Sequence, residues 1–367
     1  MALQPLVSIV IPVYNRSSVT KSCLTALRVS GATLFEPEII VADDASSDDT
    51  ADTVESFDGV RLVTNGYNVG FIRNCNRAAA TATGKYLVFL NNDTIVQSGW
   101  LEWLVSTAEE RPAAGAVGSK ILLPNGLLSE AGLLLARGGD VYEYGHKGDP
   151  DAPRYNYVRP VDFNGGCSLL VRRDLFYAIG GFSERYAPAY MDDFDLGLAV
   201  WEAGFQCLYQ PLSTVVHINF MSHGWEVSER LYRRHRPRFL RRWSGVVERQ
   251  PIVLEQRALF PASLEAAARH RGGSRMVLVI DDRPYAPHVR RELLAIEATD
   301  AHVAYAPLGS FELPQRRDLQ QEGIEVLYAY GSKTLDEAIV ETLPFADEVV
   351  FPGSRFERYA VPQVARA

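Results

Sequence analysis

Acidic side chains follow short hydrophobic runs at two places in the sequence, where they could hold a metal ion or a ligand. Residues 87–90 run into Asn91-Asn92-Asp93, and residues 39–42 run into Asp43-Asp44. Such hydrophobic runs are typical of buried strands, and ligands bind just past the carboxyl ends of strands in open α/β sheets. Because Asn and Asp also favour turns, the segment around Asp93 taken alone fits a turn as well as a ligand site.

A third acidic cluster contains Asp192, Asp193 and Asp195 at the start of a predicted helix over residues 193–203, and His217 follows a later predicted strand. Neighbouring carboxylates repel one another unless a cation or a proton relieves the charge. Oxygen ligands with one imidazole suit Mg²⁺ or Mn²⁺ better than zinc. We therefore expect a divalent ion whose coordination a substrate diphosphate completes.

Two phosphate-binding motifs are absent from the sequence. There is no G-x-x-x-x-G-K-[ST] loop, and the turn after the first predicted strand reads Pro12-Val13-Tyr14-Asn15-Arg16 instead of G-x-G-x-x-G. Without a glycine-rich loop to cradle phosphate, a metal must neutralise its charge. This argument favours Asp93 as a metal contact.

The composition is that of an ordinary α/β protein. The chain has 367 residues, 47% hydrophobic and 22% charged, with a net charge of −8, so we expect room for two domains and no nucleic-acid partner. Four widely spaced cysteines without a CxxC pair argue against structural zinc or a disulfide framework, and we expect buried thiols. The N-terminus lacks the features of a signal peptide, and no apolar run reaches the roughly 18 residues of a membrane-spanning helix. We therefore expect a cytoplasmic protein.

Strands alternate with helices over the first 90 residues, which predicts a parallel sheet with right-handed crossovers. The predicted strands cover residues 7–12, 39–42, 60–63 and 86–90, and further strands are predicted at 168–171, 207–209 and 214–217. The segment from 124 to 160 is rich in Gly, Pro, Asp and Tyr, and we interpret it as long loops.

The segment from 228 to 249 carries eight arginines and one internal proline, Pro237, which must kink or split the predicted helix. Three interpretations stay open: a solvated helix face, a surface that binds anionic lipid headgroups or a lipid-linked diphosphate, and a nucleic-acid surface. The acidic remainder of the chain argues against the third. Any peripheral membrane contact, at the inner face of the plasma membrane, would use Arg230 to Arg249.

The motifs together resemble family 2 of the inverting glycosyltransferases, which have the GT-A fold. The likeness spans roughly residues 6–243, and the sequence is similar to bacterial rhamnosyltransferase-like polysaccharide enzymes. One departure concerns the D-x-D metal motif, whose first acid is replaced by Asn91. The matching segments are residues 7–15, 41–48, 68–71, 90–94, 165–173, 180–184 and 191–196, followed by His217.

This resemblance implies roles for individual residues. Asp193 would be the catalytic base, with Asp192 as the alternative. Asp93 would contact Mn²⁺ or Mg²⁺, with His217, or alternatively His223, as a second ligand. Tyr190 and Trp225 are candidates for stacking on an acceptor sugar. The residues expected around a UDP- or dTDP-sugar donor are Pro12, Tyr14, Asn15, Asp43, Asp44, Asn68, Gly70, Phe71, Asn91 and Asn92.

The implied function is transfer of a hexose or deoxyhexose, such as rhamnose, to a saccharide or lipid-linked saccharide acceptor in O-antigen or capsule-type polysaccharide synthesis. The alternative is a non-catalytic module that binds nucleotide sugar or glycan within a larger transferase. The predicted division is a GT-A domain over 1–256, a linker over 257–274, and a partial Rossmann-like α/β segment over 275–367. This last segment resembles the opening of a GT-B glycosyltransferase domain, so we expect a truncated second domain that continues in the native chain.

Overall fold

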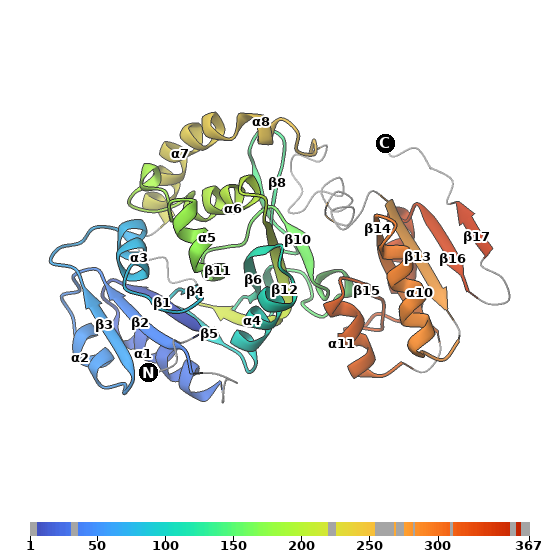
Figure 1. Cartoon of the computed structure of the whole chain (residues 1–367), viewed down its shortest axis with the longest axis horizontal. Helices are drawn as coiled ribbons and strands as arrows, with labels where there is room; N and C mark the ends of the chain where they lie inside the picture. Colours follow the sequence, from blue (N-terminus) through green and yellow to red (C-terminus); the bar gives the residue numbers. More distant parts are fainter. Residues whose placement is uncertain are drawn as a thin grey trace. The chain divides into compact units, whose positions relative to one another are not determined.

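The chain divides into two compact units (Figure 1). The computed structural model describes residues 6–30, 36–218, 225–253, 268, 275–281, 283–308, 311–352 and 357–360. Unit 1 comprises residues 1–144 and 161–250, and unit 2 comprises residues 145–160 and 251–367. The predicted linker over 257–274 lies outside the described residues except for residue 268, and so does His223.

The segment from 145 to 160 groups with unit 2, although the sequence division placed it in the first domain. Its aromatic and backbone contacts explain this grouping. The ring of Tyr157 stacks on His302 with centroids 5.0 Å apart, and the backbone N–H of Val158 donates to the carbonyl of Gln320 over 2.9 Å.

Unit 1 is built on a sheet in the order β10-β12-β6-β11-β4-β1-β2-β3. Its first four chain-order strands pair in parallel, as predicted from their alternation with helices. The buried side chains of β1 and β4 form the centre of the core. These strands and helices are β1 (Val7–Val13), α1 (Ser17–Val29), β2 (Glu38–Asp43), α2 (Thr50–Glu55), β3 (Val60–Thr64), α3 (Phe71–Ala79) and β4 (Tyr86–Leu90).

The other half of this sheet is mixed. Strand β11 lies antiparallel between β4 and β6, and β12 runs parallel to β6 and antiparallel to β5. Figure 1 shows α7 running alongside α6 within this unit. The elements are β5 (Thr94–Val96), α4 (Trp100–Glu110), β6 (Ala114–Leu122), β11 (Ser168–Arg172), α5 (Arg173–Ala178), η2 (Glu184–Tyr186), α6 (Asp192–Glu202), β12 (Gln206–His217), α7 (Trp225–Arg242) and α8 (Ser244–Val247).

Two sequence predictions about these elements need correction, and one of the two expected effects of Pro237 is excluded. The two strands predicted at 207–209 and 214–217 form one strand, β12, with a register irregularity between Gln210 and Thr214. Pro211 lies at this irregularity and has no N–H to donate to a ladder. Helix α7 continues through Pro237, which excludes a split and leaves the kink as a prediction. The predicted loops contain β7 (Leu128–Glu130), β8 (Leu133–Leu135), β9 (Val141–Glu143), η1 (Pro153–Tyr155) and the start of β10 (Arg159–Val161).

Unit 2 contains a five-stranded sheet in the order β15-β14-β13-β16-β17, drawn in orange and red in Figure 1. Strand β13 pairs in parallel with both β14 and β16. The strands that follow β13 in the chain therefore lie on both sides of it in the sheet. The relation of this unit to a GT-B domain stays a prediction. The elements are β13 (Arg275–Asp281), α10 (Pro287–Glu297), β14 (Ala301–Pro307), α11 (Leu313–Gln321), β15 (Glu325–Val326), α12 (Leu335–Thr342), η4 (Leu343–Phe345), β16 (Glu348–Phe351) and β17 (Glu357–Ala360).

Two further predictions concern side chains and membrane spans. The four cysteine thiols are buried and free, as predicted. Within the described residues, every helix is too short or too polar to cross a membrane.

Candidate active site

The carboxyl end of β4 brings Asp93 beside His217. The turn after β4 leads into β5, which pairs with β12 so that Thr94 lies opposite His217. The His217 Nε2 and Asp93 Oδ1 atoms are 3.1 Å apart, although the two residues are 124 positions apart in the sequence. The backbone N–H of Ile218 also donates to the carbonyl of Asp93 over 2.9 Å. Pairing of distant strands therefore creates the carboxylate–imidazole pair.

This pair fits a divalent ion that draws most of its ligands from elsewhere. The side chains of Asp93 and His217 keep 11% and 19% of their surface exposed, so a ligand can reach both. The part of the chain that the structure describes contains no group of three His, Cys, Asp or Glu side chains that could hold a metal. Mg²⁺ commonly binds through one or two protein groups, with substrate phosphates completing its coordination. The carboxylate and imidazole ligands therefore suit Mg²⁺ or Mn²⁺ bound together with a diphosphate.

The consecutive carboxylates Asp43 and Asp44 make different contacts at the end of β2. Asp43 accepts hydrogen bonds from the N–H and hydroxyl of Ser46 at 3.0 and 2.5 Å, both through Oδ1. Its Oδ2 atom has no partner among the described residues. Asp44 accepts from the N–H groups of Val69 and Gly70, both at 2.8 Å, and therefore anchors the loop that leads into α3.

Among the other residues expected around the donor, the exposed ones are Tyr14, at 44% exposure, and Asn68. Asn15 has a positive φ of 58° and accepts a hydrogen bond from the N–H of Ser47 over 2.8 Å, so it joins the turn after β1 to the turn after β2. Pro12 is buried within β1. This edge of the sheet therefore carries both exposed residues and a residue that joins two turns.

Four more residues predicted around the sugar donor contact protein atoms. Gly70 has a φ of 87°, and a Cβ added there would lie 2.6 Å from Pro188 Cβ, so only glycine allows this close approach. The ring of Phe71 lies 6.3 Å from that of Phe182. The Asn92 amide donates to Thr20 Oγ1 over 3.0 Å. The backbone N–H of Asn91 donates to the carbonyl of Cys167 over 3.0 Å.

The acidic residues at the start of α6 have different hydrogen-bond partners. Negative charge is favourable in the first turn of a helix. Asp193 accepts hydrogen bonds from the N–H groups of Gly166, at 3.2 Å, and Phe194, at 2.9 Å. Asp195 instead accepts from Trp243 Nε1 at 2.8 Å and pairs with Arg242 Nη1 at 2.7 Å. Asp195 therefore fastens the end of α7 to α6, and Asp193 is the most exposed of the three acids.

Burial changes the acidity of this cluster. It raises the pKa of the Asp193 carboxyl above its ordinary value. Burial and the charge of Asp193 together raise the pKa of Asp192, which is 5% exposed. A carboxylate with a raised pKa is a stronger base and is better matched to proton transfer near neutral pH.

Sequence reasoning missed one carboxylate, Glu130, at the end of β7. The N–H of Gly165 donates to Glu130 Oε1 over 3.0 Å, so the consecutive N–H groups of Gly165 and Gly166 bind Glu130 and Asp193 respectively. Burial first, and then the charge of Glu143, raises the pKa of Glu130 to about 8. The Gly165-Gly166 pair was the available signal, but its partner lay in a segment interpreted as loop.

Three consecutive residues, Gly165, Gly166 and Cys167, join the parts of the site through backbone hydrogen bonds to Glu130, Asp193 and Asn91 respectively. Burial raises the pKa of Cys167, and the charges of Glu130, Asp93 and Asp193 raise it further. Cys167 follows Gly166 directly and lies against Asn91 through the backbone hydrogen bond described above. The strand-end turn, the start of α6 and the end of β7 therefore converge on a single acidic site.

Comparison with known proteins identifies the family of this chain. The sequence profile of Glycosyl transferase family 2 matches residues 8–178. The N-acetylglucosaminyl-diphospho-decaprenol L-rhamnosyltransferase of Mycobacterium tuberculosis is 30% identical over 239 residues, which are 58% of this chain and 76% of that protein. The O-antigen biosynthesis protein RfbC of Myxococcus xanthus is 30% identical over 227 residues, which are 58% of this chain and 17% of that protein.

A third relative, the uncharacterized protein y4gI of Sinorhizobium fredii, is 30% identical over 240 residues, and this chain spans 25% of its length. Among solved structures, GalNAc-T7 with UDP, GalNAc and Mn²⁺ superposes with a TM-score of 0.50 at 17% identity, covering 59% of this chain and 44% of that one. This likeness confirms the predicted GT-A fold. The extent of the match to the rhamnosyltransferase, together with the profile match, shows that the chain belongs to glycosyl transferase family 2.

Proposed function

We propose that this protein is a metal-dependent inverting glycosyltransferase. It moves a hexose or deoxyhexose, such as rhamnose, from a nucleoside-diphosphate sugar to a saccharide or lipid-linked saccharide acceptor of a bacterial surface polysaccharide. The observation that carries the proposal is that Gly166-Cys167 contacts both Asp193 and the turn that carries Asp93, which lies beside His217. The names of the rhamnosyltransferase and O-antigen relatives support the choice of sugar and product class.

Asp93 and His217 would hold Mn²⁺ or Mg²⁺ together with the donor diphosphate. When bound, the ion supplies positive charge that stabilises the departing diphosphate. The presence of UDP and Mn²⁺ in the GalNAc-T7 structure supports this pairing of ligands. The Oδ2 of Asp43 would accept a hydrogen bond from the pyrimidine ring, and the exposed Tyr14 and Asn68 would lie along the nucleotide.

Asp193 would act as the general base. Its carboxylate takes the proton from an acceptor hydroxyl while the oxygen of that hydroxyl bonds to the anomeric carbon of the donor sugar. The bond from that carbon to the diphosphate oxygen breaks on the opposite face, the nucleoside diphosphate leaves with the electron pair, and the configuration inverts. We favour Asp193 over Asp192 because Asp193 is the less buried of the two and Gly166 orients it.

Replacing the base tests this assignment. Asp193→Asn should lower transfer by roughly 100- to 10,000-fold, the usual contribution of a general base, and leave the dissociation constant of the donor nearly unchanged. Release of nucleoside diphosphate in the presence of acceptor measures transfer, and calorimetry measures donor binding. Asp192→Asn is the matched control and should keep substantially more turnover. Full turnover by Asp193→Asn would show that another group is the base.

A second candidate function is non-catalytic binding of nucleotide sugar or glycan. Asn91 favours it, because this neutral residue leaves Asp93 as the single acid of the turn after β4. Hydrolysis of a nucleotide sugar, or transfer from it, by the purified chain would eliminate this alternative. Donor binding without either reaction, across UDP- and dTDP-sugars with Mn²⁺, would support it.

A further inference from the structure

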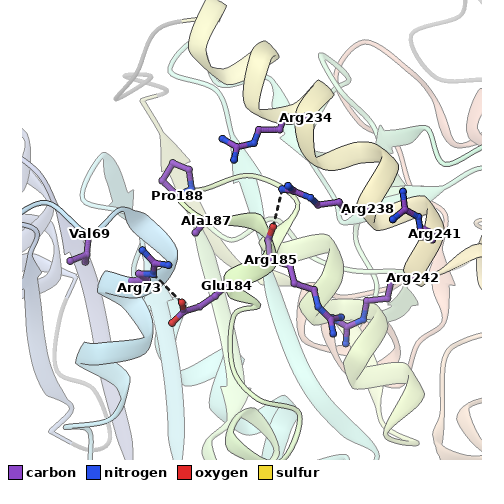
Figure 2. Close-up of a pocket in the computed structure, with 10 residues that line it drawn as sticks. All are labelled: Val69, Arg73, Glu184, Arg185, Ala187, Pro188, Arg234, Arg238, Arg241 and Arg242. Carbon is purple, nitrogen blue, oxygen red and sulfur yellow. Dashed lines mark hydrogen bonds and ion pairs between the residues drawn. The ribbon is translucent and has the colours of Figure 1, made fainter.

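A surface cavity of about 820 Å³ in unit 1 is lined by six arginines and one glutamate. Figure 2 shows these side chains gathered from α3, the segment around η2, and α7. The formal charge of the lining is therefore +5, whereas the whole chain carries −8. The lining residues are Val69, Arg73, Glu184, Arg185, Ala187, Pro188, Arg234, Arg238, Arg241 and Arg242.

Most of these guanidinium groups lack a carboxylate partner. Arg73 pairs with Glu184 over 3.0 Å, and Arg242 pairs with Asp195 over 2.7 Å. The others have no ion pair within the described part of the chain. One of them, Arg238, donates over 3.4 Å to the backbone carbonyl of Arg185. The arginines without an ion pair are Arg185, Arg234, Arg238 and Arg241.

The arginines of α7 that do not line this cavity include two that are neutralised. Arg233 pairs with Glu229 over 2.6 Å, and Arg236 pairs with Asp140 over 2.9 Å. Arg234 and Arg238, by contrast, stand four positions apart on the cavity side. Like charges at this spacing destabilise a helix. The cavity therefore concentrates the uncompensated charge of α7, which an anion would neutralise.

The anion that suits this lining is a phosphate or diphosphate ester. The planar fork of an arginine matches phosphate oxygens in a bidentate geometry, and such charge-assisted hydrogen bonds are stronger than neutral ones. The cavity is distinct from the proposed metal site, since neither Asp93 nor His217 lines it. It still borders the site, because Pro188 precedes the segment that leads to Asp192 and Asp193 and its carbonyl accepts a hydrogen bond from Ile72 at the start of α3.

We propose that this arginine cavity is a second anion site, separate from the site for the donor diphosphate, and that it binds the phosphate or diphosphate ester of a lipid. The ester would come from a lipid-linked acceptor or from a phospholipid headgroup. The acceptor source rests on the proposed function, whereas binding of the anion itself does not.

The test compares two double variants of equal charge. In Arg234→Gln/Arg241→Gln both changed residues line the cavity, and in Arg230→Gln/Arg233→Gln neither does. Inorganic pyrophosphate is titrated calorimetrically in EDTA, which removes any metal-assisted binding. Loss of charge-assisted hydrogen bonds should weaken binding by at least about tenfold in the cavity variant, with little change in the control. Neither cavity arginine has an ion pair to lose, so the variant should fold, and an unchanged melting temperature checks this.

Two further measurements identify the source of the ester. If the ester belongs to the acceptor, the cavity variant binds a short-chain prenyl diphosphate more weakly than the control variant does. The two variants then bind phosphatidylcholine vesicles containing phosphatidylglycerol with the same affinity. If it is a headgroup, the cavity variant loses vesicle binding selectively. Equal weakening of pyrophosphate binding in both double variants, or no weakening in either, would overturn the proposal.

The outcome is separable from that of the proposed function. If the wild-type protein binds pyrophosphate in this cavity but neither hydrolyses nor transfers a nucleotide sugar, the anion site is supported and the transferase proposal is refuted. If the protein transfers sugar normally and the cavity variant binds pyrophosphate as the wild type does, the transferase proposal is supported and the anion site is refuted.

Discussion

Two buried strands, one in each unit, end at an aspartate with very different partners. Strand β4 leads to Asp93 in unit 1, and strand β13 ends at Asp281 in unit 2. Arg283 donates from Nε to Asp281 Oδ1 and from Nη2 to Asp281 Oδ2, both over 2.9 Å. The side chain of Asp93 has His217 as its one partner among the described residues.

The difference separates a structural carboxylate from one that can bind a ligand. A bidentate arginine neutralises Asp281 and occupies both of its oxygens. His217 contacts Asp93 through Oδ1 alone, so among the described residues the Oδ2 atom of Asp93 stays available to a cation. The same hydrophobic strand ending in an acid therefore supports two kinds of chemistry, and the partner of the acid decides which: an arginine two residues away for Asp281, and a histidine 124 positions away for Asp93.

The largest expected effect is at Asp93, whose partner is a histidine. Asp93→Asn should reduce transfer by roughly 100-fold or more, the scale for losing one charged contact that stabilises a developing charge. The melting temperature should change little, because no ion pair with a strong cation is lost. Initial rates across a Mn²⁺ titration measure the effect. An unchanged Mn²⁺ dependence would mean that Asp93, like Asp281, does not contact the metal ion.

The paired acid should respond in the opposite way. Asp281→Asn removes a charge-assisted contact with Arg283, so the free energy of unfolding should fall by about 2 kcal/mol. Sugar transfer should be unaffected. Denaturant unfolding followed by a probe in unit 2 gives the first quantity, and the transferase assay gives the second. A large loss of transfer with intact stability would contradict the structural role of Asp281.

Glu130 offers a pH-dependent test of the same distinction. Its pKa in the folded chain is raised from 4.5 to about 8, so folding takes up a proton between these values and stability contributed by the protonated form declines as pH rises through this window. Glu130→Gln keeps an acceptor for the Gly165 N–H and cannot ionise. Its melting temperature should therefore fall less than that of the wild type between pH 5 and pH 9. Parallel curves would show that Glu130 does not hold a proton in the folded protein.

The smallest effect is expected at a polar residue already paired inside the protein. Asn92 stands next to Asp93, but its amide donates to Thr20 on α1. Asn92→Ala should lower the free energy of unfolding by about 1 kcal/mol, the usual net value of one hydrogen bond, with nearly unchanged donor affinity. Chemical denaturation and calorimetry measure the two quantities. Strong loss of donor affinity would instead assign Asn92 to the ligand.

The sequence predicted the local parts of this architecture well. The parallel strands β1 to β4 and the polar residues that end them follow from hydrophobic runs and turn residues, which are short-range signals. The antiparallel insertion of β11 and the continuity of β12 were not predicted, because strand pairing joins residues far apart in the chain. Glu130 was missed for the same reason, since its contact with Gly165 crosses 35 positions.

By itself, the sequence determined which side chains stand at strand ends and helix starts, and its ordered motifs indicated the GT-A fold and the family. The tertiary structure alone decided which of those side chains are neutralised. It gave Asp44 two backbone N–H groups at 2.8 Å and Asp195 an arginine, and it left Asp193 with longer hydrogen bonds at 3.2 and 2.9 Å and Asp93 with one histidine. The physical reason is that the availability of a carboxylate depends on donors that folding brings from distant segments, and residue spacing does not encode their positions.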